Sequence, residues 1–494
     1  MFDKSFRAAS RLCLYFSFAL SMAVYAQTSN TLVLEPCRID AGSALPTAKA
    51  RCGTFSRPEN PNEPDGQQIE LRIALVPALS VQPQPDPLII FAGGPGQGAI
   101  ESYLSLRGAF EPIRQKRDVL LIDQRGTGGS NKMGCPIPDE EIIAAGFDLE
   151  IVAAETQKCL DQLPGDPRFY TTSLAVDDID AVRRALGIET LNLWGGSYGT
   201  RVALHHLRKY PDSTRSVIID GVIAADQLLG PDLSIAAEAS MQQLFARCAE
   251  TESCLDRYGD LNEIFDGLRS RLREQPVTIT VAHPRTGEIV EQRLSHDELA
   301  GLMRLSSYQP LMRALLPLMI SEAYEGRYAM MAANAVSLND GFSDMLAMGM
   351  HNSVVCSEDA PLYVEDAAGT AAREATYMGD LQFQFLKSTC DVWPQGPMDE
   401  DFHEPVTSDI PVMLLSGEYD PVTPPANADR AMETLSNAIH IVAPQKGHIA
   451  SGVGCVPDLM SQFVRDLDVS AIDDSCVQTQ QGLPFFINPT GPTP

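Results

Sequence analysis

The apolar positions of this chain follow two patterns that alternate along its first half. Short unbroken apolar runs, typical of strands covered on both faces, lie within Pro87–Gly96, Asp118–Gly126, Thr190–Ser197, Ser216–Val222, Pro411–Glu418 and Ala438–Pro444. Between them, Thr172–Gly187 and Ser197–Pro211 have apolar residues at helical spacing and end at a glycine or a proline. Strands that alternate with helices predict a parallel sheet with helices on both faces.

Other patterns precede and interrupt this alternation. From Gln68 to Ala78, polar and apolar residues alternate, which predicts an outer strand with one wet face. Residues 27–65 before it are weakly periodic, and we interpret them as an N-terminal arm. The interval 225–405 carries amphipathic helices, such as Leu261–Arg273 and His296–Leu315, and a predicted hairpin over Val277–Leu294. We interpret this interval as a cap or lid inserted into the sheet domain.

The first 26 residues have the three regions of a secretory signal peptide. Lys4, Arg7 and Arg11 form a basic start, Leu12–Val24 is an apolar run too short to span a bilayer, and small residues precede a cleavage site after Ala26. No later stretch approaches membrane-spanning length. We therefore predict an exported protein, periplasmic or extracellular, without stable membrane insertion.

Cysteine content agrees with export. Ten cysteines remain when Cys13 in the apolar run is set aside, and an even number in an oxidising compartment favours disulfides. Sequence does not fix their connectivity, but pairing of neighbours would give Cys37–Cys52, Cys135–Cys159, Cys248–Cys254, Cys356–Cys390 and Cys455–Cys476. Zinc is not expected, because the chain has no C-x-x-C motif and no close Cys/His cluster.

The charge balance limits the possible partners. Acidic residues outnumber basic ones 65 to 37, which gives the 494 residues a formal net charge of −28. Removal of the signal segment takes away three basic residues and one acidic residue and leaves about −30. Such a polyanion repels nucleic-acid phosphates and anionic lipid headgroups, so we expect no nucleic-acid partner. The oligomeric state stays open.

The first candidate for chemistry is Ser197, the centre of the sequence Gly195-Gly196-Ser197-Tyr198-Gly199. These residues fit G-x-S-x-G between a predicted strand and a predicted helix, which is the context of a nucleophile elbow. The glycines permit a tight turn that exposes the serine, and the helix N-terminus favours developing negative charge. The alternative is a glycine-rich turn without a catalytic role, which five residues alone do not exclude.

A serine nucleophile needs a base and an acid that orients the base. Asp420 follows the strand predicted at Pro411–Glu418, and His448 follows the strand predicted at Ala438–Pro444. Both therefore fall at the carboxyl edge of the predicted sheet, where Ser197 lies. Rival acids are Glu418, close to the strand itself, and Asp429, within a predicted helix; the other histidines fall on the elbow helix (His205, His206), in a strand (His440), or in the insertion and its edges (His283, His296, His351, His403).

An oxyanion hole completes the predicted site. One donor is expected to be the backbone N–H of Tyr198, the residue after the nucleophile. A second donor is expected from the loop Phe91–Gly98, where glycines let backbone amides approach a substrate oxygen. Gly93 is the first choice and Gly94 the next.

Together these residues resemble the proline iminopeptidase and tripeptidyl aminopeptidase branch of the α/β-hydrolase serine peptidases. The resemblance rests on GGPG, DQRGTGGS, GGSYGT, DG, SGEYDPVTP and GH, which occur in this order at Gly93–Gly96, Asp123–Ser130, Gly195–Thr200, Asp220–Gly221, Ser416–Pro424 and Gly447–His448. The cysteine-containing insertion is more similar to secreted tripeptidyl aminopeptidase-like members. One departure is Ala92, where many iminopeptidases have histidine, which leaves fine substrate preference in doubt.

The resemblance implies an α/β-hydrolase fold, with a mostly parallel central sheet, helices on both faces and a large, mainly helical cap. Its expected segments are a signal peptide (1–26), an arm (27–65), the core (66–224), the cap (225–405), the second part of the core (406–480) and a tail (481–494). It also implies hydrolysis from the free amino terminus of peptides or aminoacyl amides, with no metal or cofactor.

The resemblance further implies an anion in the cap that holds the substrate's ammonium group. Val354–Pro361 is similar to an acidic cap motif of this branch, so Glu358 is the first candidate and Asp359 the second. Two alternatives remain open for the chain: an esterase, lipase or thioesterase with the same triad, and a hydrolase-like binding module without catalysis. The glycine-rich loop and the DQRG motif favour a peptidase.

Overall fold

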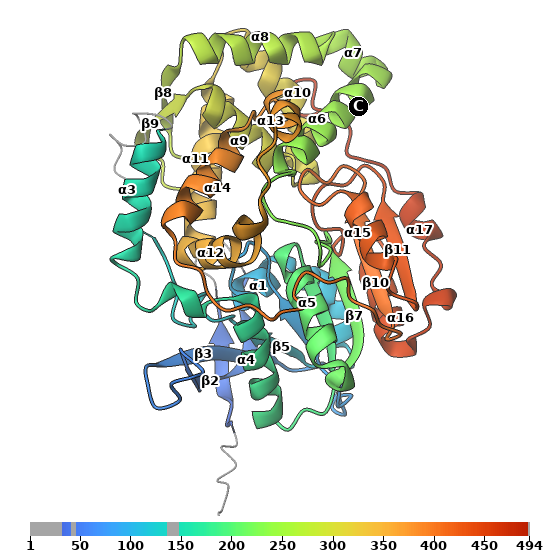
Figure 1. Ribbon diagram of the computed structural model, residues 1–494. Helices are drawn as coiled ribbons and strands as arrows, with labels where there is room; N and C mark the ends of the chain where they lie inside the picture. The colour runs from blue at the N-terminus through green and yellow to red at the C-terminus, as the bar shows by residue number, and fades with distance from the viewer. Residues whose placement is uncertain (1–31, 41–45, 136–147, 493–494) are drawn as a thin grey trace, which may run out of the picture. The chain divides into compact units, whose positions relative to one another are not determined.

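Nine strands form one mostly parallel sheet in the part of the chain that the structure describes (Figure 1). The computed structural model describes residues 32–40, 46–135 and 148–492. The strand order is β1-β2-β3-β5-β4-β6-β7-β10-β11. The bounds are Glu35–Ile39 (β1), Ala48–Pro58 (β2), Gln68–Val76 (β3), Leu88–Phe91 (β4), Val119–Ile122 (β5), Leu191–Gly196 (β6), Thr214–Asp220 (β7), Val412–Gly417 (β10) and Ala438–Ala443 (β11).

The six strands predicted from unbroken apolar runs are all present, and they form the parallel part of the sheet. Strands β5, β4, β6, β7, β10 and β11 pair in parallel, whereas β1, β2 and β3 join in antiparallel fashion at one side. Every residue of β4, β5, β6 and β10 is buried, as the unbroken apolar runs predict. The alternating stretch from Gln68 forms β3, but the expectation of an outer strand is wrong, because β3 pairs with β2 on one side and β5 on the other.

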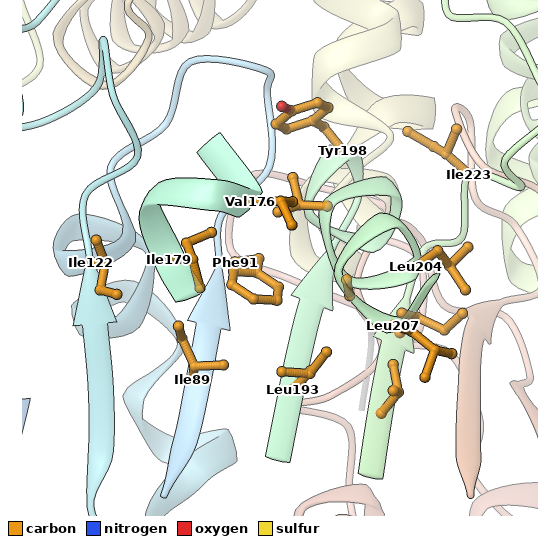
Figure 2. Packing of buried hydrophobic residues seen from close by; sticks show 14 of the residues in the cluster. Ile89, Phe91, Ile122, Val176, Ile179, Leu193, Tyr198, Leu204, Leu207 and Ile223 are labelled. Carbon is orange, nitrogen blue, oxygen red and sulfur yellow. The ribbon is translucent and has the colours of Figure 1, made fainter. Parts of the chain in front are cut away.

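The helices of the sheet domain cover both faces of the sheet. Residues of α4 and α5 pack on one face in a single apolar cluster, which includes Ile89, Phe91 and Leu193 of the strands (Figure 2). Residues of α1 and α16 pack on the other face with Leu88 and Ile90. Successive residues of β4 thus point to opposite faces. The bounds are Ala99–Arg114 (α1), Leu149–Leu160 (α3), Thr172–Ala185 (α4), Tyr198–Lys209 (α5), Pro425–Met432 (α15), Val456–Asp466 (α16) and Ser475–Gln478 (α17).

The cap has a hydrophobic core of its own. This third cluster is built from helices α6 to α11 and the hairpin β8–β9. The cap elements are Leu233–Glu250 (α6), Glu252–Tyr258 (α7), Leu261–Glu274 (α8), Val277–Ala282 (β8), Ile289–Leu294 (β9), His296–Ser306 (α9), Pro310–Tyr324 (α10), Ala329–Met345 (α11), Met348–Val354 (α12), a π-helical turn Val355–Asp359, Ala367–Glu374 (α13) and Leu381–Val392 (α14).

Three expectations about chain organisation need correction. The predicted arm supplies β1 and β2, which continue the central sheet from β3. The helix predicted over His296–Leu315 is two helices, because Pro310 holds its neighbour Gln309 in an extended conformation and begins α10. The C-terminal tail packs on the cap, where Phe485 joins the apolar cluster and the Phe486 N–H donates to Ala314 O.

All five disulfides obtained by pairing neighbouring cysteines are present. They are Cys37–Cys52, Cys135–Cys159, Cys248–Cys254, Cys356–Cys390 and Cys455–Cys476. None of the helices in the described ranges has the length and apolar character needed to cross a bilayer. The predicted signal peptide lies outside the described residues.

Candidate active site

Ser197 occupies the sharp turn between β6 and α5. Its backbone has φ 56° and ψ −125°, a conformation that residues with a side chain rarely adopt. The neighbouring strand β4 approaches α5 so closely that a Cβ on Gly199 would lie 2.2 Å from Phe91 O. Only glycine fits there, which explains the motif around the serine. The strained turn places Ser197 at the N-terminus of α5, as a nucleophile elbow requires.

His448 and Asp420 form a hydrogen-bonded pair at the same edge of the sheet. His448 Nδ1 lies 2.7 Å from Asp420 Oδ2. The Asp420 side chain is fully buried, and it accepts further hydrogen bonds from the N–H groups of Val422 and Thr423 and from Thr423 Oγ1. Burial lowers the pKa of His448, but the charge of Asp420 and the hydrogen bond to it prevail, so the pKa is raised above its usual 6.5.

The turn after β7 brings this pair next to Ser197. The Ser197 N–H donates to Asp220 O at 2.8 Å. The following residue, Gly221, packs so tightly on the imidazole that a Cβ there would lie 2.9 Å from His448 Cε1. Sequence reasoning placed Ser197, Asp420 and His448 at one sheet edge. In the structure His448 pairs with Asp420, and the Asp220–Gly221 turn contacts both Ser197 and the imidazole.

Asp220 is a buried residue to which sequence reasoning gave no role. Its carboxylate accepts hydrogen bonds from the N–H groups of Ala450 and Ser451 and from Ser451 Oγ, just beyond His448. Burial raises the pKa of Asp220 above its usual 3.8. Asp220 thereby fixes the histidine loop relative to the elbow, and its signal in the sequence was the Asp-Gly pair that ends the strand.

The predicted oxyanion loop lies beside the serine. A Cβ on Gly93 would be 3.1 Å from Ser197 Cβ, so the loop passes directly over the elbow. Tyr198 is the first residue of α5, where backbone N–H groups have no helical acceptor. The cap holds the far side of the loop, since Ala347 N–H donates to Gly96 O at 3.0 Å. Gly93 thus lies against the candidate nucleophile, Tyr198 follows it in the chain, and Gly94 is the next residue of the loop.

Glu358 and Asp359 lie in a buried network on the cap's π-helical turn. Asp359 accepts two hydrogen bonds from Arg201 of α5, at 2.9 and 2.8 Å, and one from Leu229 N–H. Glu358 accepts hydrogen bonds from Thr172 N–H and Thr172 Oγ1 and lies 3.7 Å from Arg201. Burial raises the pKa of Glu358 to about 8, although the charge of Arg201 opposes this rise.

This network reaches the elbow through a tyrosine hydroxyl. Thr172 Oγ1 lies 2.6 Å from the hydroxyl of Tyr198, and Gln124 Nε2 donates to the same hydroxyl at 3.0 Å. Gln124 belongs to the DQRG motif, for which residue types alone gave no role. Three separate segments thus converge on the side chain that follows the nucleophile.

The rival residues have other partners. Asp429 pairs with His440 at 2.9 Å, and Glu418 accepts a hydrogen bond from Gln445 N–H. His205 contacts Asp399 on α5's outer side, and His206 is buried against Thr214. Neither rival acid contacts His448 among the described residues. Of the three candidate acids, Asp420 is thus the one that pairs with His448.

The fold and the site define an α/β-hydrolase, and comparison with known families agrees. A family model described as "alpha/beta hydrolase fold" matches residues 86–280, and one described as "TAP-like protein" matches residues 376–476. The chain therefore has the α/β-hydrolase fold, and its residues 376–476 are similar to TAP-like proteins.

Individual relatives have low sequence identity to the chain, but two of the three match most of its length. The putative hydrolase YuaR of Escherichia coli is 24% identical over 412 residues, which cover 78% of this chain and 79% of the relative. The serine protease Hip1 of Mycobacterium tuberculosis is 24% identical over 468 residues, covering 87% and 88%. A tripeptidyl aminopeptidase of Streptomyces coelicolor is 25% identical over 206 residues, covering 38% and 37%.

Proposed function

We propose that the chain is an exported serine exopeptidase that hydrolyses peptides from the free amino terminus through an acyl-enzyme. The observation that carries the proposal is the strained Ser197 at the carboxyl edge of the sheet, beside the hydrogen-bonded His448–Asp420 pair. The serine protease and tripeptidyl aminopeptidase names of two relatives favour peptides as substrates.

The proposed reaction has two steps, formation of an acyl-enzyme on Ser197 and its hydrolysis by water, and His448 acts in both. His448 removes the Ser197 hydroxyl proton as the oxygen attacks the substrate carbonyl, and Asp420 stabilises the imidazolium. Backbone N–H groups of Tyr198 and Gly93 or Gly94 bind the oxyanion. The imidazolium then gives its proton to the leaving amine, and the scissile bond breaks to leave an acyl-enzyme. Water, activated by His448, attacks the ester and releases the acid, which restores the Ser197 hydroxyl.

We propose Glu358 as the residue that recognises the substrate's ammonium group. Its support is chemical: the carboxyl has a pKa of about 8, so a cation that arrives nearby would favour its charged form. Only Thr172 separates it from the Tyr198 hydroxyl. Asp359 no longer serves as a second anchor in this proposal, because its oxygens accept hydrogen bonds from Arg201 and Leu229 N–H.

Substrate pairs that differ only at the amino terminus test the proposal. Mono-, di- and tripeptidyl amides with free amines are expected to be cleaved, whereas their N-acetyl forms are expected to react at least about tenfold more slowly. Equal rates on both, or activity on acyl esters alone, would replace the aminopeptidase by an esterase. If Glu358→Gln lowers the cleavage rate of free-amine substrates alone, Glu358 binds the substrate's ammonium group. If it lowers the rates of all substrates equally, Glu358 is a positioning residue for Tyr198.

Export is the remaining part of the proposal. Its support is the five disulfides, since such bonds form and persist in oxidising compartments. Cleavage after Ala26 predicts a mature protein that begins at Gln27. Mass spectrometry of the protein from the periplasm and the medium checks this, and an uncleaved cytoplasmic product would contradict it.

A further inference from the structure

Arg304 carries a positive charge on the cap side of the candidate site. It lies on α9, and its Nη1 donates to the Tyr308 hydroxyl at 2.6 Å. Tyr308 in turn lies against the base: its ring centroid is 5.1 Å from that of His448, and Tyr308 O accepts the His448 N–H. One residue therefore separates the guanidinium from the catalytic imidazole.

The guanidinium of Arg304 has donors without acceptors. An arginine offers five N–H donors, and in the described part of the chain only Tyr308 accepts one of them. Its Nε is buried and has no acceptor. Arg313, another cap arginine with no carboxylate partner among the described residues, instead donates to Ser240 and to Tyr419 O. The protein covers Nε, so a ligand would reach the guanidinium through Nη2, which has no hydrogen-bond acceptor among the described residues.

The residues around Arg304 show that its charge acts on the reaction centre. The nearby acid Asp420 is already committed to His448 and Thr423. Burial lowers the pKa of His351, and the charge of Arg304 lowers it further. His351 Nδ1 lies 3.3 Å from Pro95 O, in the oxyanion loop. The pKa of His448 is raised overall, but the charge of Arg304, like burial, opposes this rise. The charge of Arg304 thus opposes the protonation of His448 and of His351, which contacts the oxyanion loop at Pro95 O.

We propose that Arg304 binds a carboxylate of the substrate and makes the enzyme selective for short peptides that carry one near the scissile bond. The carboxylate is either the free C-terminus of a short peptide or an acidic side chain. Arginine suits this role because its planar donors match both oxygens of a carboxylate. In a chain with net charge −28, a local cation is needed to offset the repulsion of an anionic substrate. The proposal rests on the proposed function only in taking peptides as ligands.

Binding to the Ser197→Ala variant tests this without turnover. Calorimetry compares Ala-Ala-Ala as the free acid and as the amide, each with a free or an acetylated amino terminus, together with Ala-Asp-Ala amide. The free acid is expected to bind at least about tenfold tighter than the amide. Adding Arg304→Met is expected to abolish the difference, and Arg304→Lys to restore part of it. Arg293→Met, on a cap arginine paired with Glu298, is the matched control and is expected to preserve the difference.

The peptide set separates the possible results. Tight binding of Ala-Asp-Ala amide that depends on Arg304 assigns the site to side-chain carboxylates; tight binding of Ala-Ala-Ala acid alone assigns it to the C-terminus. Equal binding of acid and amides, absence of binding by all peptides, or a preference that survives Arg304→Met overturns the proposal. Acetylation reports on a different claim: if acetylated acids bind as tightly as free ones, recognition of the free amine fails while the role of Arg304 stands.

Discussion

Two sets of a serine, a histidine and an aspartate occur in the sheet domain, and their surroundings differ. The first is Ser197, His448 and Asp420 at the carboxyl edge of the sheet, and the second is Ser416, His440 and Asp429 around β10 and β11. In the second, His440 of β11 lies 2.9 Å from Ser416 Oγ through Nε2 and 2.9 Å from Asp429 Oδ1 through Nδ1. The same residue types are therefore connected by hydrogen bonds of ordinary length. Contacts among a serine, a histidine and an aspartate do not by themselves define a nucleophile.

The difference between the two lies in backbone and burial. Ser416 is fully buried within β10, where its backbone belongs to the strand ladder. Ser197 stands in a strained turn at a helix N-terminus, beside a glycine-rich loop. The buried serine, Ser416, goes with the exposed acid, since the side chain of Asp429 is 70% exposed. The acid of the first set, Asp420, is fully buried. Catalysis needs an accessible serine and a dry, fixed acid, and only the first arrangement has both.

The largest expected effect separates the two serines. Ser197→Ala is expected to lower kcat by about a millionfold and to abolish labelling by a fluorophosphonate probe, because the attacking oxygen is lost. Ser416→Ala is the matched control and is expected to keep kcat/KM within about threefold. Undiminished labelling of Ser197→Ala would remove the assignment, and loss of labelling in Ser416→Ala alone would reverse it.

The two acids give the next largest contrast. Asp420→Asn is expected to lower kcat about ten thousandfold, since the amide cannot stabilise the imidazolium or hold the required tautomer. Asp429→Asn is expected to change kcat by less than about twofold, because its carboxylate is exposed and remote from Ser197. Steady-state kinetics on one substrate compare them; equal losses would mean that both arrangements serve the reaction.

The pH profile sharpens the comparison of the two histidines. His448 must be neutral to accept the serine proton, and its pKa is raised above 6.5. Activity is therefore expected to fall as the pH decreases through this raised pKa, at a higher pH than for free imidazole. The acid limb of kcat/KM against pH measures this. His440→Gln is expected to leave that limb in place, and a shift in this variant would contradict the assignment of the base.

The smallest effect concerns stability. Ser416→Ala removes the buried hydrogen-bond partner of His440 Nε2 and is expected to cost about 1 kcal/mol in the free energy of unfolding. Asp429→Asn, at the exposed end of the same arrangement, is expected to cost about 0.3 kcal/mol. Denaturant unfolding of both variants measures the difference. A larger cost for Asp429→Asn would show that the exposed pair has the greater structural role.

Local patterns predicted most of the central sheet. Unbroken apolar runs identified the six parallel strands, because strands buried on both faces need apolar residues at every position. The strands β1 and β2 were missed because many of their side chains are exposed and polar. The break between α9 and α10 was also missed, although Pro310 was its visible signal.

Long-range contacts were beyond sequence reasoning. The acidic cap motif was found at Glu358 and Asp359, but its partners Thr172 and Arg201 lie more than 150 residues away. Which acid faces which cation depends on how the cap packs on α5, and no local pattern records that. For the same reason nothing in the sequence distinguished Arg304 from the other arginines on amphipathic helices.

The sequence by itself determined the alternation of strands and helices, the turn at Ser197 and the order in which serine, aspartate and histidine follow buried strands. These features depend on side-chain periodicity and on glycine geometry, which act over a few residues. Only the tertiary structure decided that Asp420 rather than Asp429 faces His448, and that Arg304 and Glu358 lie near the site. Those outcomes depend on packing between segments that are distant in the sequence. A buried charged group must find a partner there, and only the packing determines which residue is close enough.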